Sequence, residues 1–233
     1  EIWMNDKNMS PLRYYTEIQA EKLSEKIGNE EIIIDFAMRY GNPSINSKIH
    51  RLQKQGCEKL IILPLYPQYA AATTATVCDE VYRTLMKMRW QPSLKIIPHY
   101  ESEPLYIEAI KNSIEKKISE ISWRPDLIVA SYHGIPKKYF EKGDPYHCYC
   151  HKTTRLISEK YSDIKIITTF QSRFGPQEWL QPYTDKTLEN LPKEGKKNIL
   201  VICPGFSSDC VETLEEISIQ GKESFIKSGG ENF

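Results

Sequence analysis

The stretch that decides the fold is Leu127-Ile128-Val129-Ala130-Ser131-Tyr132-His133-Gly134-Ile135-Pro136. Its apolar first half is typical of a strand that is buried on both faces, as in a parallel sheet. The Gly-Ile-Pro turn then ends this strand abruptly. His133 therefore stands at the carboxyl end of a strand, which is where open α/β sheets bind their ligands.

Apolar runs and amphipathic stretches alternate along the rest of the chain. The runs predict strands at residues 32–37, 60–65, 94–98, 127–131, 164–170 and 199–203. The amphipathic stretches predict helices at residues 10–28, 44–56, 73–89, 103–121, 150–161, 185–191 and 208–228. This alternation predicts an α/β fold in which helices cover parallel sheets.

A domain boundary is expected at Trp123-Arg124-Pro125, because the residue before a proline disfavours the α-helix. We expect two similar Rossmann-like lobes, at residues 1–123 and 124–233, with a cleft between them that is a common kind of ligand site. The first lobe opens on a helix with no strand before it, and the chain stops just after a helix. We therefore expect the first lobe to be truncated and the chain to be a piece of a longer protein.

The composition argues against several classes of protein. Thirty-one Lys and Arg balance 31 Asp and Glu, whereas a general nucleic-acid binder carries a basic excess. No run approaches the roughly 20 apolar residues of a membrane helix, and no signal peptide is visible. The six cysteines lack the spacing of a disulfide framework, so a reducing cytoplasm is expected.

A second strand end, Cys203-Pro204-Gly205-Phe206, leads into a helix that carries four carboxylates. On an α-helix, Asp209, Glu212 and Glu216 share one face, because they are spaced i, i+3 and i+7, and Glu215 points elsewhere. An ordinary solvated face with an acidic first turn is the alternative. Because the helix follows a strand end, a functional site is favoured over a solvated face. At such a site the carboxylates, together with a neutral imidazole, would handle protons or a metal ion.

The loop at residues 64–69 contains two prolines, two tyrosines and a glutamine. Tyr66, Gln68 and Tyr69 either wall a flat apolar ligand or pack as a rigid turn on the surface.

Arg39 and Trp179 have two interpretations each, and a third segment is weak evidence for a metal site. Arg39, which precedes Tyr40 at a strand end, either binds a ligand carboxylate or forms an internal salt bridge. Trp179 either stacks on a flat ligand or fills the core. The segment Cys148-Tyr149-Cys150-His151 is similar to part of a metal motif, but it supplies too few ligands at an unusual spacing.

Several of these segments together resemble the ferrochelatases, the enzymes that insert ferrous iron into protoporphyrin to make haem. They are AMRYGNPS (37–44), LPLYPQY (63–69), SYHGIP (131–136), KGDPY (142–146), TFQSRFGPQEWLQPYTD (169–185) and CPGFSSDCVETLEEI (203–217). They occur in the family's order and cover nearly the whole chain, and the bacterial type is the most similar.

The resemblance implies a chelatase-like fold of two lobes and a set of site residues. It makes His133 and Glu212 the catalytic and metal-binding pair, and it extends the metal site along the helix through Asp209 and Glu216. The porphyrin contacts that it implies are Arg39, Tyr40, Tyr66, Gln68, Tyr69, Ser131 and Trp179.

The resemblance also implies the partners. Protoporphyrin IX and Fe²⁺ are substrates, no cofactor is tightly bound, and no iron–sulfur cluster is expected in this chain. No nucleic acid is expected, and the hydrophobic substrate is compatible with loose contact to a membrane surface.

Two alternatives stay open. The first is a related chelatase of the same fold for cobalt or for coproporphyrin, although LPLYPQY and QSRFGPQEW favour the haem enzyme. The second is a non-catalytic module that binds a tetrapyrrole or a metal.

Overall fold

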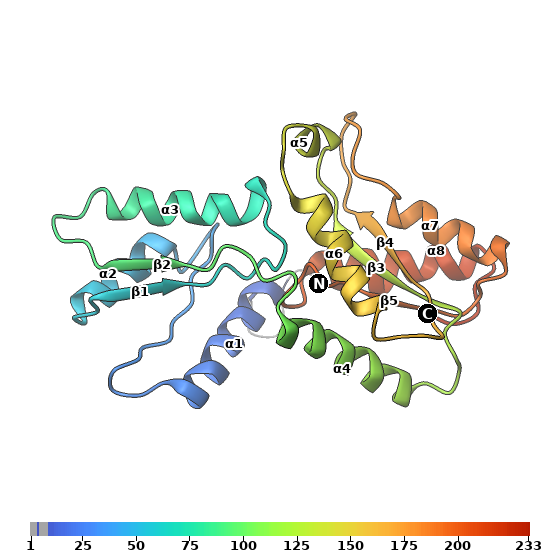
Figure 1. Cartoon of the computed structure of the whole chain (residues 1–233), viewed down its shortest axis with the longest axis horizontal. Coiled ribbons are helices and arrows are strands. Elements are labelled where there is room, and N and C mark those ends of the chain that lie inside the picture. The colour runs from blue at the N-terminus through green and yellow to red at the C-terminus, as the bar shows by residue number, and fades with distance from the viewer. Residues whose placement is uncertain (1–3, 5–8) are drawn as a thin grey trace. The chain divides into compact units, whose positions relative to one another are not determined.

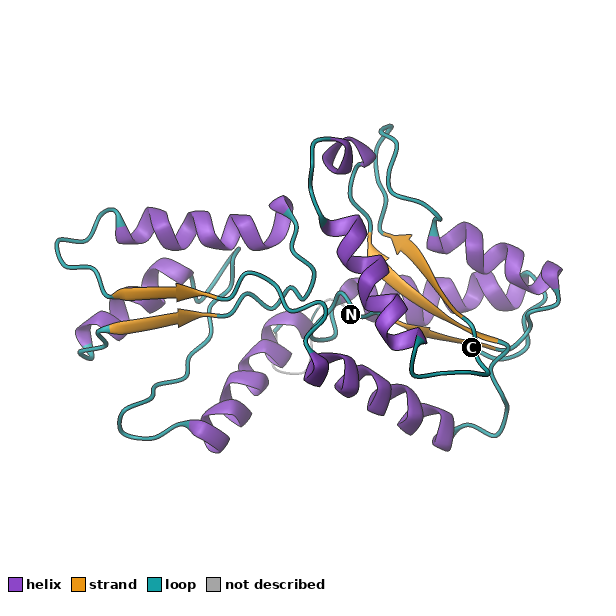
Figure 2. Cartoon of the chain, in the orientation of Figure 1, coloured by secondary structure: helices purple, strands orange, loops and turns teal. Residues whose placement is uncertain are grey.

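The structure, a computed structural model, describes Met4 and residues 9–233, and it is an α/β protein with parallel sheets flanked by helices (Figures 1 and 2). Its contacts divide the chain into two compact units. The first consists of Glu1–Leu65, Ala71–His99 and Ser208–Val211, and the second of Tyr66–Ala70, Tyr100–Ser207 and Glu212–Phe233.

The first unit is built on two parallel strands, β1 (Lys59–Ile62) and β2 (Ser93–Ile96). Its helices are α1 (Pro11–Ile27), α2 (Ile45–Lys54) and α3 (Thr76–Leu85), and a π-helical turn, η1 (Ala71–Ala75), leads into α3. Two helices begin where the sequence predicts, because the hydroxyls of Ser10 and Ser44 accept hydrogen bonds from backbone N–H groups of their first turns.

The strand predicted at residues 32–37 does not form. Only an isolated bridge joins Met38 to Ser44 nearby. The side chain of Asn29 accepts a hydrogen bond from the N–H of Ile32 (3.0 Å), which turns the backbone at the start of the run. A β-branched run becomes a strand only where a neighbouring strand pairs its backbone groups, and no strand pairs with residues 32–37 in the described part of the chain.

The second unit contains a parallel sheet of three strands in the order β4 (Ile166–Gln171), β3 (Leu127–His133) and β5 (Ile199–Ile202). Residues 127–131 of the central strand are at most 3% exposed. This confirms the prediction of a strand that is buried on both faces.

Helices cover both faces of this sheet (Figure 1). The helical segments are α4 (Pro104–Glu120), α5 (Lys137–Glu141), α6 (Tyr146–Ser158), α7 (Thr184–Asn190), the 3₁₀ helix η2 (Leu191–Glu194), the π-helix η3 (Glu212–Gly221) and α8 (Lys222–Lys227). The sequence does not predict α5, because five residues are too few to show a helical period.

Alternation along β3 sends its side chains into two cores. Ile128, Ala130 and Tyr132 join a cluster with α4 and α6. Leu127 and Val129 join a second cluster with α7 and α8. Ser131 and His133 follow Val129 in this alternation, so they lie on the α7–α8 face.

The compact units do not follow the expected lobe boundary between residues 123 and 124. Helix α4 precedes that boundary, yet Ile107 and Ile114 bury it in the core of the second unit. The division into lobes 1–123 and 124–233 stays a prediction.

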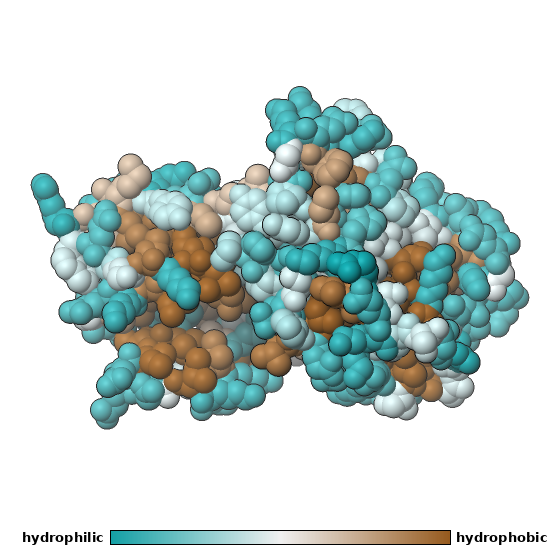
Figure 3. Space-filling view, viewed as in Figure 1, coloured by the Kyte–Doolittle hydropathy of each residue, from teal (hydrophilic) through white to brown (hydrophobic). Residues whose placement is uncertain are grey.

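Apolar side chains also reach the surface of the first unit. Figure 3 shows them in brown over the region of β1 and β2, where Ile61 is 71% exposed and Leu63 is 49% exposed. Among the residues that the structure describes, no helix is both long enough and apolar enough to cross a membrane.

Candidate active site

His133 is the last residue of β3, and its side chain is half-buried. Its Nδ1 lies 2.6 Å from the carbonyl oxygen of Gly134. Since a carbonyl oxygen only accepts, Nδ1 of the neutral ring carries the proton and Nε2 keeps its lone pair. Phe206 lies beside the imidazole, with 6.4 Å between ring centroids. The ring therefore presents one basic nitrogen, in an orientation set by the turn that follows it.

That turn packs too closely to accommodate a side chain at Gly134. The N–H of Gly134 donates to the carbonyl oxygen of Gln171 (2.8 Å). A Cβ at Gly134 would lie 2.9 Å from this oxygen and 3.2 Å from the indole of Trp179. Trp179 is 6% exposed and packs on Phe174, and its Nε1 has no hydrogen-bond partner in the described part of the chain. Trp179 thus supports the histidine turn, and its contact with a ligand stays a prediction.

Gln171, at the end of β4, connects the sheet to the acidic helix. It pairs in register with His133, so the two side chains face the same side of the sheet. Its Nε2 donates to the carbonyl oxygen of Glu212 and to the carboxylate of Glu216, both at 3.0 Å. Its Oε1 accepts from the hydroxyl of Ser131 (2.7 Å). These contacts bring the backbone of Glu212 and the carboxylate of Glu216 to the face that carries His133, at the carboxyl end of the strands.

Ser172 holds the carboxylate of Glu216 as well. Its backbone N–H donates to Glu216 (2.6 Å), and so does its hydroxyl. Ser172 has a φ of 62°, a left-handed conformation that is strained for a residue other than glycine. Backbone strain at the end of a strand, on the face that carries a basic imidazole, is typical of functional sites.

The acidic helix is a π-helix from Glu212 to Gly221, which corrects the α-helix expected over residues 208–228. Side-chain contacts five residues apart follow its wider turn, as when the hydroxyl of Ser218 donates to the carbonyl oxygen of Thr213 (3.0 Å). A Cβ at Gly221 would lie 3.1 Å from Leu188 of α7, so glycine allows close packing at the end of the π-helix. Short π-helical segments are frequent at functional sites.

The change of helix type separates the predicted acidic residues. Gln171 contacts the backbone carbonyl of Glu212 and the carboxylate of Glu216, so these two residues stay close to the same strand end. Asp209 precedes the helix, is exposed and belongs to the first compact unit, so the α-helical spacing that grouped it with them does not apply. Its role in a metal path stays a prediction.

Glu212 and Glu215 have different surroundings. The carboxylate of Glu212 is half-buried and has neither a hydrogen bond nor an ion pair with any residue that the structure describes. One oxygen of Glu215 accepts from Gln220 (3.1 Å), and the other is buried. Glu212 is therefore the carboxylate that is available to a ligand.

Two predicted porphyrin contacts are buried in hydrogen-bond networks. Gln68 is 2% exposed, and its Nε2 donates to Thr153 of α6 (3.0 Å) and to Tyr106 of α4 (3.3 Å). Ser131 is fully buried and also bonds the hydroxyl of Thr184 (2.8 Å). This geometry gives both residues a supporting position, and direct contact with substrate stays a prediction.

The other predicted contacts lie nearer to the surface. Tyr66 and Tyr69 are half-buried beside Gln68 in the second unit. In the first unit, Tyr40 is 71% exposed and the guanidinium of Arg39 lies 4.5 Å from the centre of its ring. Arg39 forms no ion pair with a described carboxylate, so the structure does not show the internal salt bridge that was the alternative.

The segment Cys148-Tyr149-Cys150-His151 is not a thiolate site. Cys150 is fully buried in the core, where desolvation raises the pKa of its thiol well above the ordinary value. Among the described residues, no group of three or more His, Cys, Asp or Glu side chains is arranged to hold a metal ion.

Sequence reasoning missed three residues that build this site: Gln171, Ser172 and Phe206. Gln171 is a polar residue at the carboxyl end of a buried strand, which is the signal that identified His133. Ser172 and Phe206 follow strand ends as well, but nothing in the local sequence predicts a left-handed serine or a ring contact between distant segments.

Comparisons with known proteins identify the same family over nearly the whole chain. The family model described as Ferrochelatase matches residues 2–233. Ferrochelatases of Allorhizobium ampelinum and Rhizobium meliloti are both 57% identical to this chain, over 236 and 235 residues, and the match covers 100% of this chain and 69% of each relative. The ferrochelatase of Mesorhizobium japonicum is 53% identical, with 67% of it covered.

A solved structure, SirB from Bacillus subtilis with Fe³⁺, superimposes with a TM-score of 0.55 at 14% identity. The superposition covers 94% of this chain and 90% of that one. At this identity the similarity concerns the fold alone.

Proposed function

Because the chain belongs to the ferrochelatase family, we propose that it inserts Fe²⁺ into protoporphyrin IX with His133 and Glu212 at the reacting centre. The enzyme is a lyase of haem biosynthesis. The observation that supports this choice of residues is the hydrogen bonding of Gln171, which joins the strand end that carries His133 to the π-helix that carries Glu212.

The reaction needs a base, because two pyrrole N–H protons leave as the iron enters. The Nδ1–H of His133 is engaged with the carbonyl of Gly134, so Nε2 is the atom that accepts a pyrrole proton. The carboxylate of Glu212 has no competing partner among the described residues, and it accepts the second proton or guides the iron. The balance is one Fe²⁺ in and two protons out.

Glu216 has a different role in this proposal. Gln171 and Ser172 hold its carboxylate with three hydrogen bonds. We assign Glu216 and Asp209 to an acidic path for the cation, as the resemblance to the family implies. Oxygen ligands suit a metal in transit, since thiolates bind such ions more tightly and oppose their release.

Porphyrin binding must supply strain as well as affinity. A planar porphyrin hides the lone pairs of its nitrogens, and bending the ring exposes them at a cost that contacts elsewhere on the macrocycle must offset. We assign those contacts to the predicted set of Arg39, Tyr40, Tyr66, Gln68, Tyr69, Ser131 and Trp179.

The remaining expectations belong to this proposal. The iron is a substrate, and no tightly bound cofactor or iron–sulfur cluster takes part. The reaction is placed in the cytoplasm, with loose contact to a membrane surface where the porphyrin is delivered.

The decisive experiment compares His133→Ala with His50→Ala, an exchange on α2 of the first unit. Both are made in the protein at its full natural length, and haem formation from Fe²⁺ and protoporphyrin IX is followed by absorbance without oxygen. We expect His133→Ala to lower turnover by about 100-fold or more, as for loss of a general base, and thermal unfolding to stay unchanged. Near-normal turnover of His133→Ala would remove the proposed role.

The same assay tests the alternatives. Faster insertion into coproporphyrin, or of cobalt into a corrin precursor, would move the assignment to a related chelatase. Tight porphyrin binding by the unaltered protein without any product would indicate a binding module.

A further inference from the structure

Helix α6 carries two histidines, His147 and His151, four residues apart. Their ring centroids lie 4.4 Å apart, with an angle of 56° between the ring planes. Residues spaced i and i+4 share one face of an α-helix. Helical zinc motifs use this spacing to hold one ion between two imidazoles.

Aromatic walls restrict both rings. Phe140 of α5 lies 4.9 Å from the ring of His147. Phe170 of β4 stacks on His147 at 5.7 Å and an angle of 21°, and it lies 6.1 Å from His151. A ligand pair whose rotamers are limited by packing loses less conformational entropy when it binds an ion.

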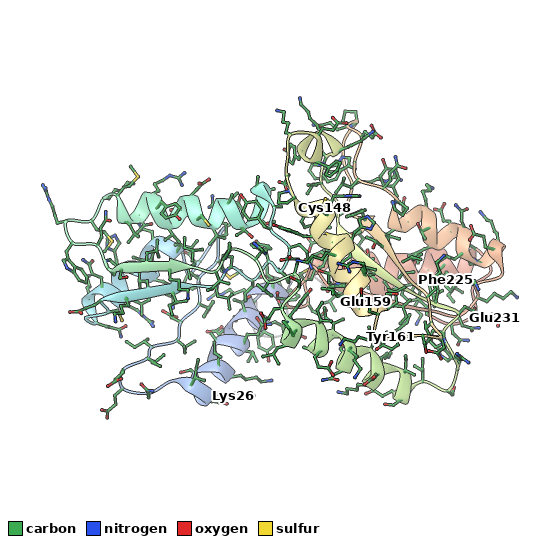
Figure 4. All side chains as sticks on the ribbon, in the orientation of Figure 1. Lys26, Cys148, Glu159, Tyr161, Phe225 and Glu231 are labelled. Atoms are coloured by element: carbon green, nitrogen blue, oxygen red, sulfur yellow. The ribbon has the colours of Figure 1, made fainter. Side chains whose placement is uncertain are left out.

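Solvent reaches the pair. His151 and the neighbouring Cys148 are exposed, and Figure 4 labels Cys148 on α6. An ion can therefore arrive from water and keep water molecules as further ligands.

This pair lies apart from the candidate active site within the second unit. Phe170, which stacks on His147, pairs in register with Tyr132. Gln171, the next residue, pairs with His133. Successive side chains of a strand face opposite sides of a sheet, so the histidine pair lies on the α6 face and His133 on the other.

We propose that His147 and His151 bind one divalent cation of the late first-row transition metals, the class of Ni²⁺, Cu²⁺ and Zn²⁺. At Zn–N distances of about 2.0–2.1 Å, two imidazoles on a tetrahedral ion have ring centres roughly 5 Å apart. The two rings, whose centroids lie 4.4 Å apart, would need to rotate outward only slightly to reach this separation. The described residues provide no third side-chain ligand, so water fills the other positions.

The chemistry of the rings supports this assignment. Desolvation lowers the pKa of both imidazoles, and each ring therefore keeps a free lone pair near neutral pH. A site of two imidazoles and water imposes little geometry, so the order of affinity should follow the general series, with Cu²⁺ above Ni²⁺ and Fe²⁺ below both. The site would thus favour competing metals over the iron substrate.

The test is calorimetric titration of the full chain with Zn²⁺ under a reducing agent that does not bind metals. We expect His147→Gln and His151→Gln each to remove one zinc equivalent or to weaken it at least tenfold. His50→Gln and Cys148→Ser should leave that equivalent unchanged. His133→Ala should also retain it, which separates this site from metal binding at the candidate active site.

Two further results decide the matter. Electron paramagnetic resonance of bound Cu²⁺ should show coupling to two imidazole nitrogens in the unaltered protein and to one in either glutamine variant. The proposal is overturned if both glutamine variants, folded by circular dichroism, bind Zn²⁺ with unchanged number and affinity. It is equally overturned if Cys148→Ser removes the equivalent that the glutamine variants retain.

Discussion

Both the nitrogen and the oxygen of the Gln171 side-chain amide form hydrogen bonds. Its nitrogen donates to the π-helix, at the Glu212 carbonyl and the Glu216 carboxylate, and its oxygen accepts from Ser131. A carboxylate in this position could not donate, and an apolar side chain would remove one hydrogen bond from each of three polar groups. Glutamine is thus the residue type that the site requires, although none of these bonds involves substrate.

Gln171→Leu should therefore destabilise the protein and disturb the π-helix. Because Gln171 is 3% exposed, water cannot replace the lost bonds easily, and we expect the free energy of unfolding to fall by about 2–3 kcal/mol. Ser131→Ala removes one bond to Gln171 and one to Thr184 and should cost about 1–2 kcal/mol. Urea unfolding of both variants measures the difference. Equal stability of Gln171→Leu and the unaltered protein would contradict the hydrogen-bond network described above.

Glu212 and Glu215 offer a matched pair for the proposed chemistry. Glu212→Gln keeps the shape of the side chain and removes its charge, so we expect turnover to fall by about 100-fold. Glu215→Gln removes a charge three residues away, and we expect turnover to change by less than about tenfold, since its carboxylate faces Gln220 and the protein interior. Steady-state haem formation measures both. Equal losses would mean that the acidic face of the π-helix is not aimed at the reacting centre.

Among the elements, five of the six strands predicted from the sequence form in the structure. The starts of α1 and α2 also follow from local sequence signals. The strand at residues 127–131 can be predicted from its own sequence, because an apolar segment bounded by a turn has few other structures available. Residues 32–37 show the same local signal and remain coil, since a strand also needs a partner for its backbone.

The sequence also failed to predict the π-helix, for a different reason. Carboxylates at i and i+4 are neighbours on an α-helix, and Glu212 and Glu216 stay close to the same strand end here, so the sequence pattern does not distinguish the two helix types. The contacts that accompany the wider turn, from Gln171 and from Leu188 against Gly221, come from segments that are distant in sequence. Local periodicity contains no information about them.

Strand β1 allows a test of the first unit's burial pattern at adjacent positions. Leu60 is 6% exposed and Ile61 is 71% exposed, because successive side chains face opposite sides. Leu60→Ala should lower the free energy of unfolding by about 2–4 kcal/mol, as for other large-to-small core changes. Ile61→Ala should stay within about 0.5 kcal/mol, as for surface changes. Chemical unfolding provides both values, and a large loss for Ile61→Ala would show that this face is covered in solution.

At the scale of the whole molecule, the two units differ in how completely their sheets are enclosed. The central strand β3 is paired on both sides and packed against helices on both faces. In the described part of the chain, strands β1 and β2 have one partner each, and Ile61 of β1 and the nearby Leu63 are exposed apolar side chains. The sequence predicted an α/β chain correctly, but it could not predict this difference, which depends on the neighbours that each sheet has.

Native-state hydrogen exchange should therefore separate the two sheets. Local stability follows buried apolar contacts and enclosed backbone hydrogen bonds, so amides of Ile128 to Tyr132 should exchange about 100-fold more slowly than amides of Leu60 to Ile62. Mass spectrometry of peptic fragments, at two pH values to confirm that opening is at equilibrium, measures both segments in one sample. Equal protection would mean that β1 and β2 are enclosed in solution as fully as β3.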